Sequence, residues 1–113
     1  MTMFELFVKK ETGLEIIAEF KFCKTRRFKS DYYIPELKLL IEKEGGIYTG
    51  KAHGSITGIL RDIEKYNLAT ILGYKILRYQ PKDLMSYKTI EDINKIKGLC
   101  TTYNQHEDLK GNE

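Results

Sequence analysis

Three acidic residues that could do metal chemistry lie in two stretches that otherwise read as buried strands. Asp31 lies in the first stretch, and Glu42 and Glu44 lie in the second. An ionised carboxylate in an apolar environment is costly unless a cation compensates it. Strand side chains alternate between faces, so Glu42 and Glu44 share one face, and a turn at residues 35–36 would bring Asp31 beside them. Three carboxylates so placed could hold a Mg²⁺-type ion; the alternative is three solvated acids on an exposed sheet face.

A cluster of basic residues directly precedes the first acid. It consists of Lys21, Lys24, Arg26, Arg27 and Lys29, with three phenylalanines interleaved. The net charge of +3 is too small to indicate a nucleic-acid-binding protein, but a local cluster of cations beside an acidic site suits a ligand with a phosphate backbone. The alternative is a solvated edge strand, because edge strands often carry lysines that discourage aggregation.

The hydrophobic pattern predicts an α/β fold with the element order α-β-β-β-α-β. A turn-rich segment with four of the nine glycines, residues 45–57, should lie between the third strand and the second helix. We expect Gly13 to end the first helix and Gly73 to end the second. The predicted helices are 3–11, 58–72 and 89–97, and the predicted strands are 14–23, 28–34, 37–43 and 74–79.

Length and composition bound the class of protein. The 113 residues predict one domain over residues 1–100, followed by a polar and frayed tail over 101–113. No apolar stretch is long enough to span a bilayer and no signal-like segment opens the chain, so we expect no membrane partner and a cytoplasmic protein. Cys23 and Cys100 lack the spacing of a zinc site and should be free thiols.

An ordered series of short motifs runs through residues 14–79. The series is Glu19, Arg26-Arg27-Phe28, Asp31, Pro35-Glu36, Glu42-Lys43-Glu44-Gly45-Gly46, Gly50 with His53, Lys65-Tyr66-Asn67 and Gly73-Tyr74-Lys75-Ile76-Leu77-Arg78. Each motif is weak alone, but the ordered set resembles the restriction-endonuclease-like PD-(D/E)XK superfamily of nucleases. The resemblance is to small phage and prophage endonuclease-domain proteins, in the branch near the very-short-patch-repair endonucleases.

The resemblance implies a restriction-endonuclease-like core, in which a mixed four-stranded sheet is flanked by helices. It also implies a metal-dependent DNA endonuclease that hydrolyses phosphodiester bonds. Such an enzyme would select DNA by its structure, as junction resolvases, repair endonucleases and phage endonucleases do. Asp31, Glu42 and Glu44 would hold Mg²⁺ or Mn²⁺, and the basic cluster would contact DNA. Related small resolvases often pair, so a homodimer is a further expectation.

One departure from the superfamily pattern concerns the catalytic lysine, whose usual position on the strand is occupied by Glu44. The resemblance suggests that Lys65, on the following helix, supplies that charge from another direction; the alternative is a solvated lysine. His53 could orient or deprotonate the attacking water, or contact the scissile phosphate, unless it is simply an exposed loop residue. Glu19 is a candidate accessory acid, against the alternative of a solvent-facing carboxylate.

The missing strand lysine leaves a second function open, a catalytically inactive nucleic-acid-binding module of the same fold. The retained acids argue against this function, because a pure binding protein gains nothing from carboxylates placed near phosphates. A structural or protein-interaction domain is a third alternative. Motif spacing does not choose among branched, mismatched, nicked or sequence-specific substrates.

Overall fold

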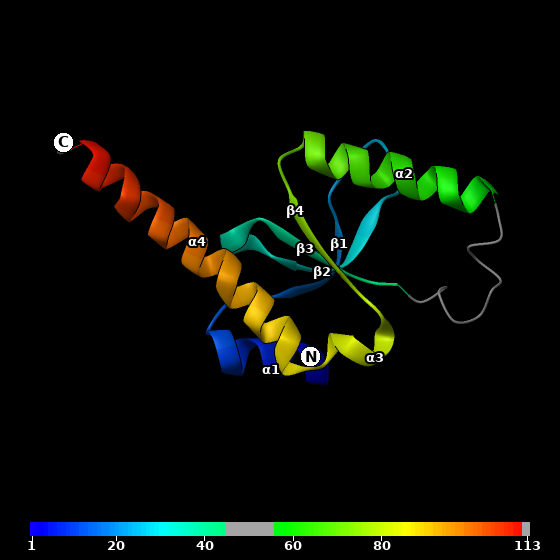
Figure 1. Ribbon diagram of the computed structural model, residues 1–113. Helices are drawn as coiled ribbons and strands as arrows, with labels where there is room; N and C mark the ends of the chain where they lie inside the picture. The colour runs from blue at the N-terminus through cyan, green and yellow to red at the C-terminus, as the bar shows by residue number, and fades with distance from the viewer. Residues whose placement is uncertain (45–55, 112–113) are drawn as a thin grey trace.

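The chain folds into a four-stranded mixed sheet with helices on both faces (Figure 1). This computed structural model describes the backbone of residues 1–44 and 56–111, and the side chains of residues 1–44 and 56–99. Its elements are α1 (Met3–Thr12), β1 (Ile17–Lys21), β2 (Lys29–Ile34), the 3₁₀ turn η1 (Pro35–Leu37), β3 (Leu39–Lys43), α2 (Ile56–Ile71), β4 (Lys75–Tyr79), α3 (Pro81–Leu84) and α4 (Tyr87–Gly111).

The strands lie in the order β1-β2-β3-β4. The first three strands pair antiparallel, and β4 pairs parallel to β3 after the chain has crossed over through α2. Pro35 begins η1, and Lys38 ends it in the left-handed conformation with φ of 51°. The predicted α/β class, the mixed four-stranded sheet and the turn at residues 35–36 are therefore confirmed.

The central strand β3 is covered on both faces. Leu39 and Ile41 belong to one apolar cluster, which the sheet forms with α1, α3 and α4. Leu40, between them, belongs to a second cluster on the opposite face, with Ala69 of α2 and Phe28. The two faces of β3 thus contact different helices, and the face under α2 also carries Glu42, the one acidic residue of this strand.

Helix α1 is defined by a cap at each end. Thr2 accepts a hydrogen bond of 3.2 Å from the backbone N–H of Glu5, which satisfies one of the free donors of the first turn. Gly13 follows the helix in the left-handed conformation, with φ of 74°, and donates 2.8 Å to the carbonyl of Lys9. Gly73 has φ of 89° just after α2, so both predicted glycine stops are confirmed.

The C-terminal third differs from the expectation. The sequence predicted a helix over 89–97, whereas α4 begins at Tyr87 and continues to Gly111, through most of the stretch predicted to be a frayed tail. The short helix α3 was not predicted. Pro81 occupies its first position, where the backbone N–H that proline lacks would have no partner within the helix. The division of the chain at residue 100 stays a prediction. Over the described ranges, no helix combines the length and apolar character needed to cross a bilayer.

Candidate functional site

Asp31 and Glu42 lie side by side on neighbouring strands. Tyr32 of β2 pairs with Ile41 of β3, so the next antiparallel step places Asp31 beside Glu42. The Asp31 Oδ2 atom accepts a hydrogen bond of 2.8 Å from the backbone N–H of Lys43, and this bond holds the Asp31 carboxylate against β3. The structure therefore brings two of the three predicted acids together.

Glu42 also contacts the lysine that the motif series placed on α2. Lys65 Nζ lies 2.8 Å from Glu42 Oε1, and the two side chains are only 16% and 6% exposed. Among the described residues, no well-aligned hydrogen bond reaches this buried oxygen, so the contact is an ion pair. Burial raises the pKa of Glu42 to about 7; Lys65 opposes the increase, while the charge of Asp31 and a hydrogen bond with its carboxyl add to it.

The packing of α2 explains why Lys65 points inward. Ala69 lies one turn further along the same face of the helix and is 0% exposed, so its small side chain allows the helix to approach the sheet closely. Leu68 packs against the same apolar cluster. Lys65 and Leu68 are thus both directed toward the sheet. The guanidinium of Arg61, one turn before Lys65, lies 6.0 Å from the Phe28 ring centre.

Glu44 has a different set of partners from the other two acids. Its Oε1 atom accepts hydrogen bonds from Arg78 Nε and, at 3.2 Å, from the Tyr66 hydroxyl. The Arg78 guanidinium also stacks on Tyr66, 4.4 Å from the ring centre. Burial and the charges of Glu42 and Glu44 raise the pKa of Tyr66, so its hydroxyl stays protonated and able to donate.

The donor set suits a hard divalent cation only in part. No group of three His, Cys, Asp or Glu side chains is close enough to hold a metal within the residues described. Asp31 and Glu42 nevertheless offer adjacent oxygen donors, and magnesium is commonly bound by one or two carboxylates and several waters. Lys65 Nζ already lies 2.8 Å from the Glu42 Oε1 atom, so a metal ion would share this carboxylate with the lysine. These two acids are therefore the ligands a metal would use, and a place for Glu44 in the same shell stays a prediction.

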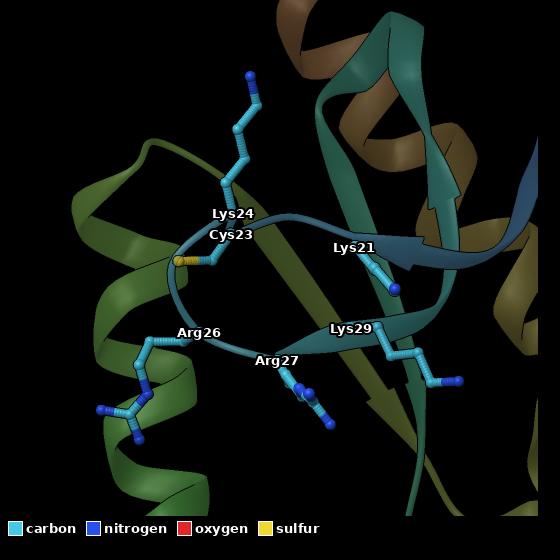
Figure 2. Close-up of a pocket in the computed structure, with 6 residues that line it drawn as sticks. All are labelled: Lys21, Cys23, Lys24, Arg26, Arg27 and Lys29. Carbon is cyan, nitrogen blue, oxygen red and sulfur yellow. The ribbon is translucent and has the colours of Figure 1, made fainter.

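The five predicted DNA-binding cations line one hollow. Its volume is about 610 Å³, and Cys23 is its sixth lining residue. Figure 2 shows Arg26 directed toward α2, and Lys24 pointing the opposite way from Arg27. The hollow, which we call the basic groove, is lined by Lys21, Cys23, Lys24, Arg26, Arg27 and Lys29. The structure thus places these cations around one concave surface.

Two of the groove cations already have acidic partners. Arg26 makes a two-pronged contact with Glu64 of α2, and its guanidinium lies 5.0 Å from the Phe28 ring centre. Lys29 Nζ lies 2.5 Å from Glu19 Oε2, and this contact raises the pKa of Lys29. The other three basic side chains form no ion pair with a described carboxylate, so they are the cations most available to a phosphate.

Glu19 lies on β1, next to the strand that carries Asp31, and has a partner of its own. It is held by Lys29, and this contact lowers its pKa. Glu19 lies opposite Asp31, between two paired positions of β1 and β2, but its φ of 57° is in the left-handed region that non-glycine residues rarely adopt. The expected role of Glu19 as an accessory acid stays a prediction. His53 and the glycines of the preceding loop, Gly45, Gly46 and Gly50, lie outside the described residues.

Arg78 and Tyr66 were not predicted as site residues. The alternation in β4 contained the signal for Arg78, because Ile76 packs in the cluster under α2 and Arg78 follows two positions later. The parallel register pairs Arg78 with Glu42 across the strands. Tyr66 entered only as part of the motif Lys65-Tyr66-Asn67, and its bond to Glu44 depends on the distance between α2 and β3, which the sequence does not give.

Comparison of the chain with protein-family models, with curated proteins and with solved structures finds no match.

Proposed function

We propose that this protein is a Mg²⁺- or Mn²⁺-dependent endonuclease that hydrolyses phosphodiester bonds in DNA. The observation that carries the proposal is the pairing of Asp31 and Glu42 on adjacent strands, with Lys65 facing them from α2. Two carboxylates can hold a divalent cation, and a positioned lysine can offset the negative charge that develops on the phosphate. The basic groove next to it suits the phosphate backbone of the substrate.

The order of elements supports a restriction-endonuclease-like core. Three antiparallel strands are followed by a helix and a fourth strand parallel to the third. The acids lie on the second and third strands, and the lysine lies on the helix that joins the third strand to the fourth. This arrangement agrees with the motif series, in which the strand lysine is absent and Lys65 takes its role.

In this mechanism, Asp31 and Glu42 would hold the metal. A bound Mg²⁺ would polarise the scissile phosphate and lower the pKa of a water that attacks it. Lys65 offsets negative charge that develops on the phosphate in the transition state. The backbone N–H of Lys43 keeps Asp31 in place, and Arg78 and Tyr66 hold the Glu44 carboxylate.

The basic groove would position the DNA. Lys29 and Asp31 are two residues apart on β2, a spacing of about 6.6 Å along a strand. A nucleic-acid backbone lying in the groove therefore passes close to the acid pair. Phosphate contacts of this kind fix the position of DNA and carry no sequence information directly, so they leave the choice of DNA structure open.

One observation favours the inactive nucleic-acid-binding module as a second candidate. The ion pair between Glu42 and Lys65 compensates the buried carboxylate without a metal. A protein that had lost its metal could therefore keep this pair for stability alone.

A cleavage assay separates the two candidates. Plasmid, linear, nicked and four-way-junction DNA would be incubated with Mg²⁺, Mn²⁺ or EDTA, using wild type, Glu42→Gln and the matched control Glu36→Gln, whose side chain is exposed on η1. We expect metal-stimulated cleavage by wild type and by Glu36→Gln, and none by Glu42→Gln. DNA binding without metal-stimulated cleavage of any substrate would favour the binding module.

A further inference from the structure

Arg78 lies on the same face of the sheet as the acid pair Asp31 and Glu42. In the parallel register it is the partner of Glu42, and such partners lie about 4.8 Å apart and point to the same face. Ile76, two positions earlier on β4, belongs to the apolar cluster under α2, so Arg78 also faces that helix. Arg78 is therefore a neighbour of the proposed metal site, although the proposed function gives it no contact with DNA.

The guanidinium of Arg78 uses only one of its three nitrogens within the described part of the chain. Its Nε atom donates to Glu44 Oε1, and neither terminal nitrogen bonds to a described residue. Arg26 differs in this respect, because both of its terminal nitrogens donate to the carboxylate of Glu64. The side chain of Arg78 is 52% exposed, so a ligand can reach it from solvent.

Two contacts hold this guanidinium in one orientation. It lies over the Tyr66 ring, 4.4 Å from the ring centre. The Tyr66 hydroxyl donates 3.2 Å to Glu44 Oε1, the same oxygen that accepts from Arg78 Nε. Glu44, Tyr66 and Arg78 thus form a closed triad in which each residue contacts the other two. Donors that are already oriented lose less entropy on binding than a flexible side chain does.

The Tyr66 ring also brings Arg78 close to the second cation of this site. Lys65 Nζ lies 5.6 Å from the same ring centre. Lys65 is only 16% exposed and is paired with Glu42, whereas more than half of the Arg78 side chain is in solvent. Arg78 is thus the cation of these two that is more open to a phosphate arriving from solvent.

The strand order places Arg78 on the far side of the acid pair from the basic groove. The acid pair lies on the central strands β2 and β3, the groove lies at the β1–β2 connection, and β4 follows β3 at the edge of the sheet. Neighbouring strands are about 4.8 Å apart, so about 10 Å separates the backbones of Asp31 and Arg78 across the sheet. A DNA backbone that leaves the groove and passes the acid pair therefore reaches Arg78 next.

We propose that Arg78 binds a phosphate of the DNA backbone through its two terminal nitrogens, with Glu44 and Tyr66 as its positioning residues. The two parallel N–H groups of a guanidinium match two oxygens of one phosphate. The metal and Lys65 would act on the scissile phosphate, so Arg78 contacts a phosphate beside it. This inference rests on the proposed function, because that function is what brings DNA to the acid pair.

Fluorescence anisotropy with a DNA duplex in EDTA tests the contact without cleavage. Wild type is compared with Arg78→Ala and with the control Lys10→Ala, whose side chain is exposed on α1. Arg78→Ala should bind about tenfold more weakly, and the slope of log affinity against log salt concentration should decrease by about one. Lys10→Ala should match wild type. Wild-type affinity and slope in Arg78→Ala would overturn the proposal and leave Arg78 as a structural partner of Glu44.

A double-mutant cycle tests the positioning role of Tyr66. Tyr66→Phe keeps the ring that Arg78 covers and removes only the hydrogen bond to Glu44. This change should weaken DNA binding about threefold when Arg78 is present and leave it unchanged in the Arg78→Ala background. A purely structural role would lower the free energy of unfolding without this dependence on Arg78. Equal effects in the two backgrounds, or no effect in either, would contradict the triad.

Arg78→Lys keeps the proposal testable if Arg78→Ala folds poorly. A lysine retains the charge but cannot make a two-pronged contact, so this variant should keep the salt slope of wild type and lose affinity about threefold. Full affinity in Arg78→Lys would contradict the two-pronged contact. A wild type that binds DNA and cleaves none would contradict the endonuclease alone, because these measurements need no cleavage. A wild type that binds no DNA would overturn both.

Discussion

Glu42 is the residue in which stability and chemistry conflict most directly. Its side chain is 6% exposed, and burial holds its pKa at about 7 although Lys65 is 2.8 Å away. A buried carboxylate of this kind lowers the stability of the protein when it is ionised. A loss of stability on ionisation at one position is typical of functional sites. Because this loss depends on the ionisation of Glu42, it can be measured as a change of stability with pH.

We expect the free energy of unfolding to contain a pH dependence that belongs to Glu42. The pKa is about 7 in the folded state and near its usual value of 4.5 when unfolded. Between these values the folded state binds more protons, so stability falls as pH rises from about 4.5 to 7, by about 3 kcal/mol. The free energy of unfolding of Glu42→Gln should not fall over this pH range, whereas that of Glu36→Gln should fall as in wild type. Urea unfolding at a series of pH values measures both. Identical pH profiles for wild type and Glu42→Gln would show that Glu42 has an ordinary pKa.

Lys65 gives a second prediction at this scale. If it stabilises the transition state, Lys65→Ala should reduce turnover at saturating DNA by about a hundredfold or more. An ordinary phosphate contact would change only the affinity and the dependence on salt. Single-turnover cleavage distinguishes these results, with the exposed Lys82 changed to Ala as the control. A change confined to affinity would assign Lys65 to DNA binding.

At the scale of elements, the β1–β2 connection determines how DNA would be held. It gathers all five cations around one hollow, but Arg26 and Lys29 already contact Glu64 and Glu19. Those two cations must give up a carboxylate before they contact a phosphate. Arg27 has no such partner among the described residues, so it should contribute most directly to binding.

Arg27→Ala should therefore weaken DNA binding and flatten its dependence on salt, by about one unit in the slope of log affinity against log salt concentration. Arg26→Ala should change the slope less, because the Arg26 guanidinium is already paired with the Glu64 carboxylate and is less available to a phosphate. Fluorescence anisotropy at several salt concentrations measures both variants, and Lys10→Ala on α1 is the control. Equal slopes in wild type and Arg27→Ala would remove the groove from the proposed binding surface.

Helix α2 shows what could be predicted from the sequence and what could not. The spacing of Ile59, Ile63 and Tyr66 correctly predicted a helix. Periodicity did not reveal which face is buried, because that depends on what lies beneath the helix, and here it is a carboxylate that needs Lys65. The bonds of Glu44 to Arg78 and Tyr66 escaped prediction for a similar reason, since they depend on the spacing of α2, β3 and β4.

The elements predicted best were those that depend on local chemistry. Gly13 and the turn at Pro35 were predictable because left-handed backbone and a fixed proline φ restrict the choice of residue. The extent of α4 was not predictable from a short window, because its polar second half gives no amphipathic signal. The pairing of Asp31 with Glu42 followed from alternation and one turn, which is why this part of the site could be predicted.

At the scale of the whole molecule, two apolar clusters on opposite faces of the sheet stabilise the fold. The larger cluster joins α1, α3 and α4 to the sheet, and Ile93 of α4 lies at its centre with 0% exposure. Ile96, one turn later, is only partly buried against the same cluster. The first turns of α4 are therefore part of the core.

Ile93→Ala should lower the free energy of unfolding by about 3 kcal/mol, because it leaves a cavity in a fully buried site. Ile96→Ala should cost about 1 kcal/mol, since part of that side chain is already in water. Urea denaturation with an unchanged m-value checks both changes. Similar losses for the two variants would mean that α4 packs differently from the arrangement in this structure.

The parallel pairing of β3 with β4 also has a consequence for the order in which the protein folds. The strands β1, β2 and β3 are joined by short connections, whereas β4 reaches β3 only after the long crossover through α2. Contacts between distant segments form later because closing a long loop costs more entropy. Asp31 and Glu42 should thus meet in an early antiparallel intermediate, before Lys65 is present to compensate them. The mutual repulsion of these two carboxylates would slow that step at neutral pH, and docking of α2 would be the event that relieves it.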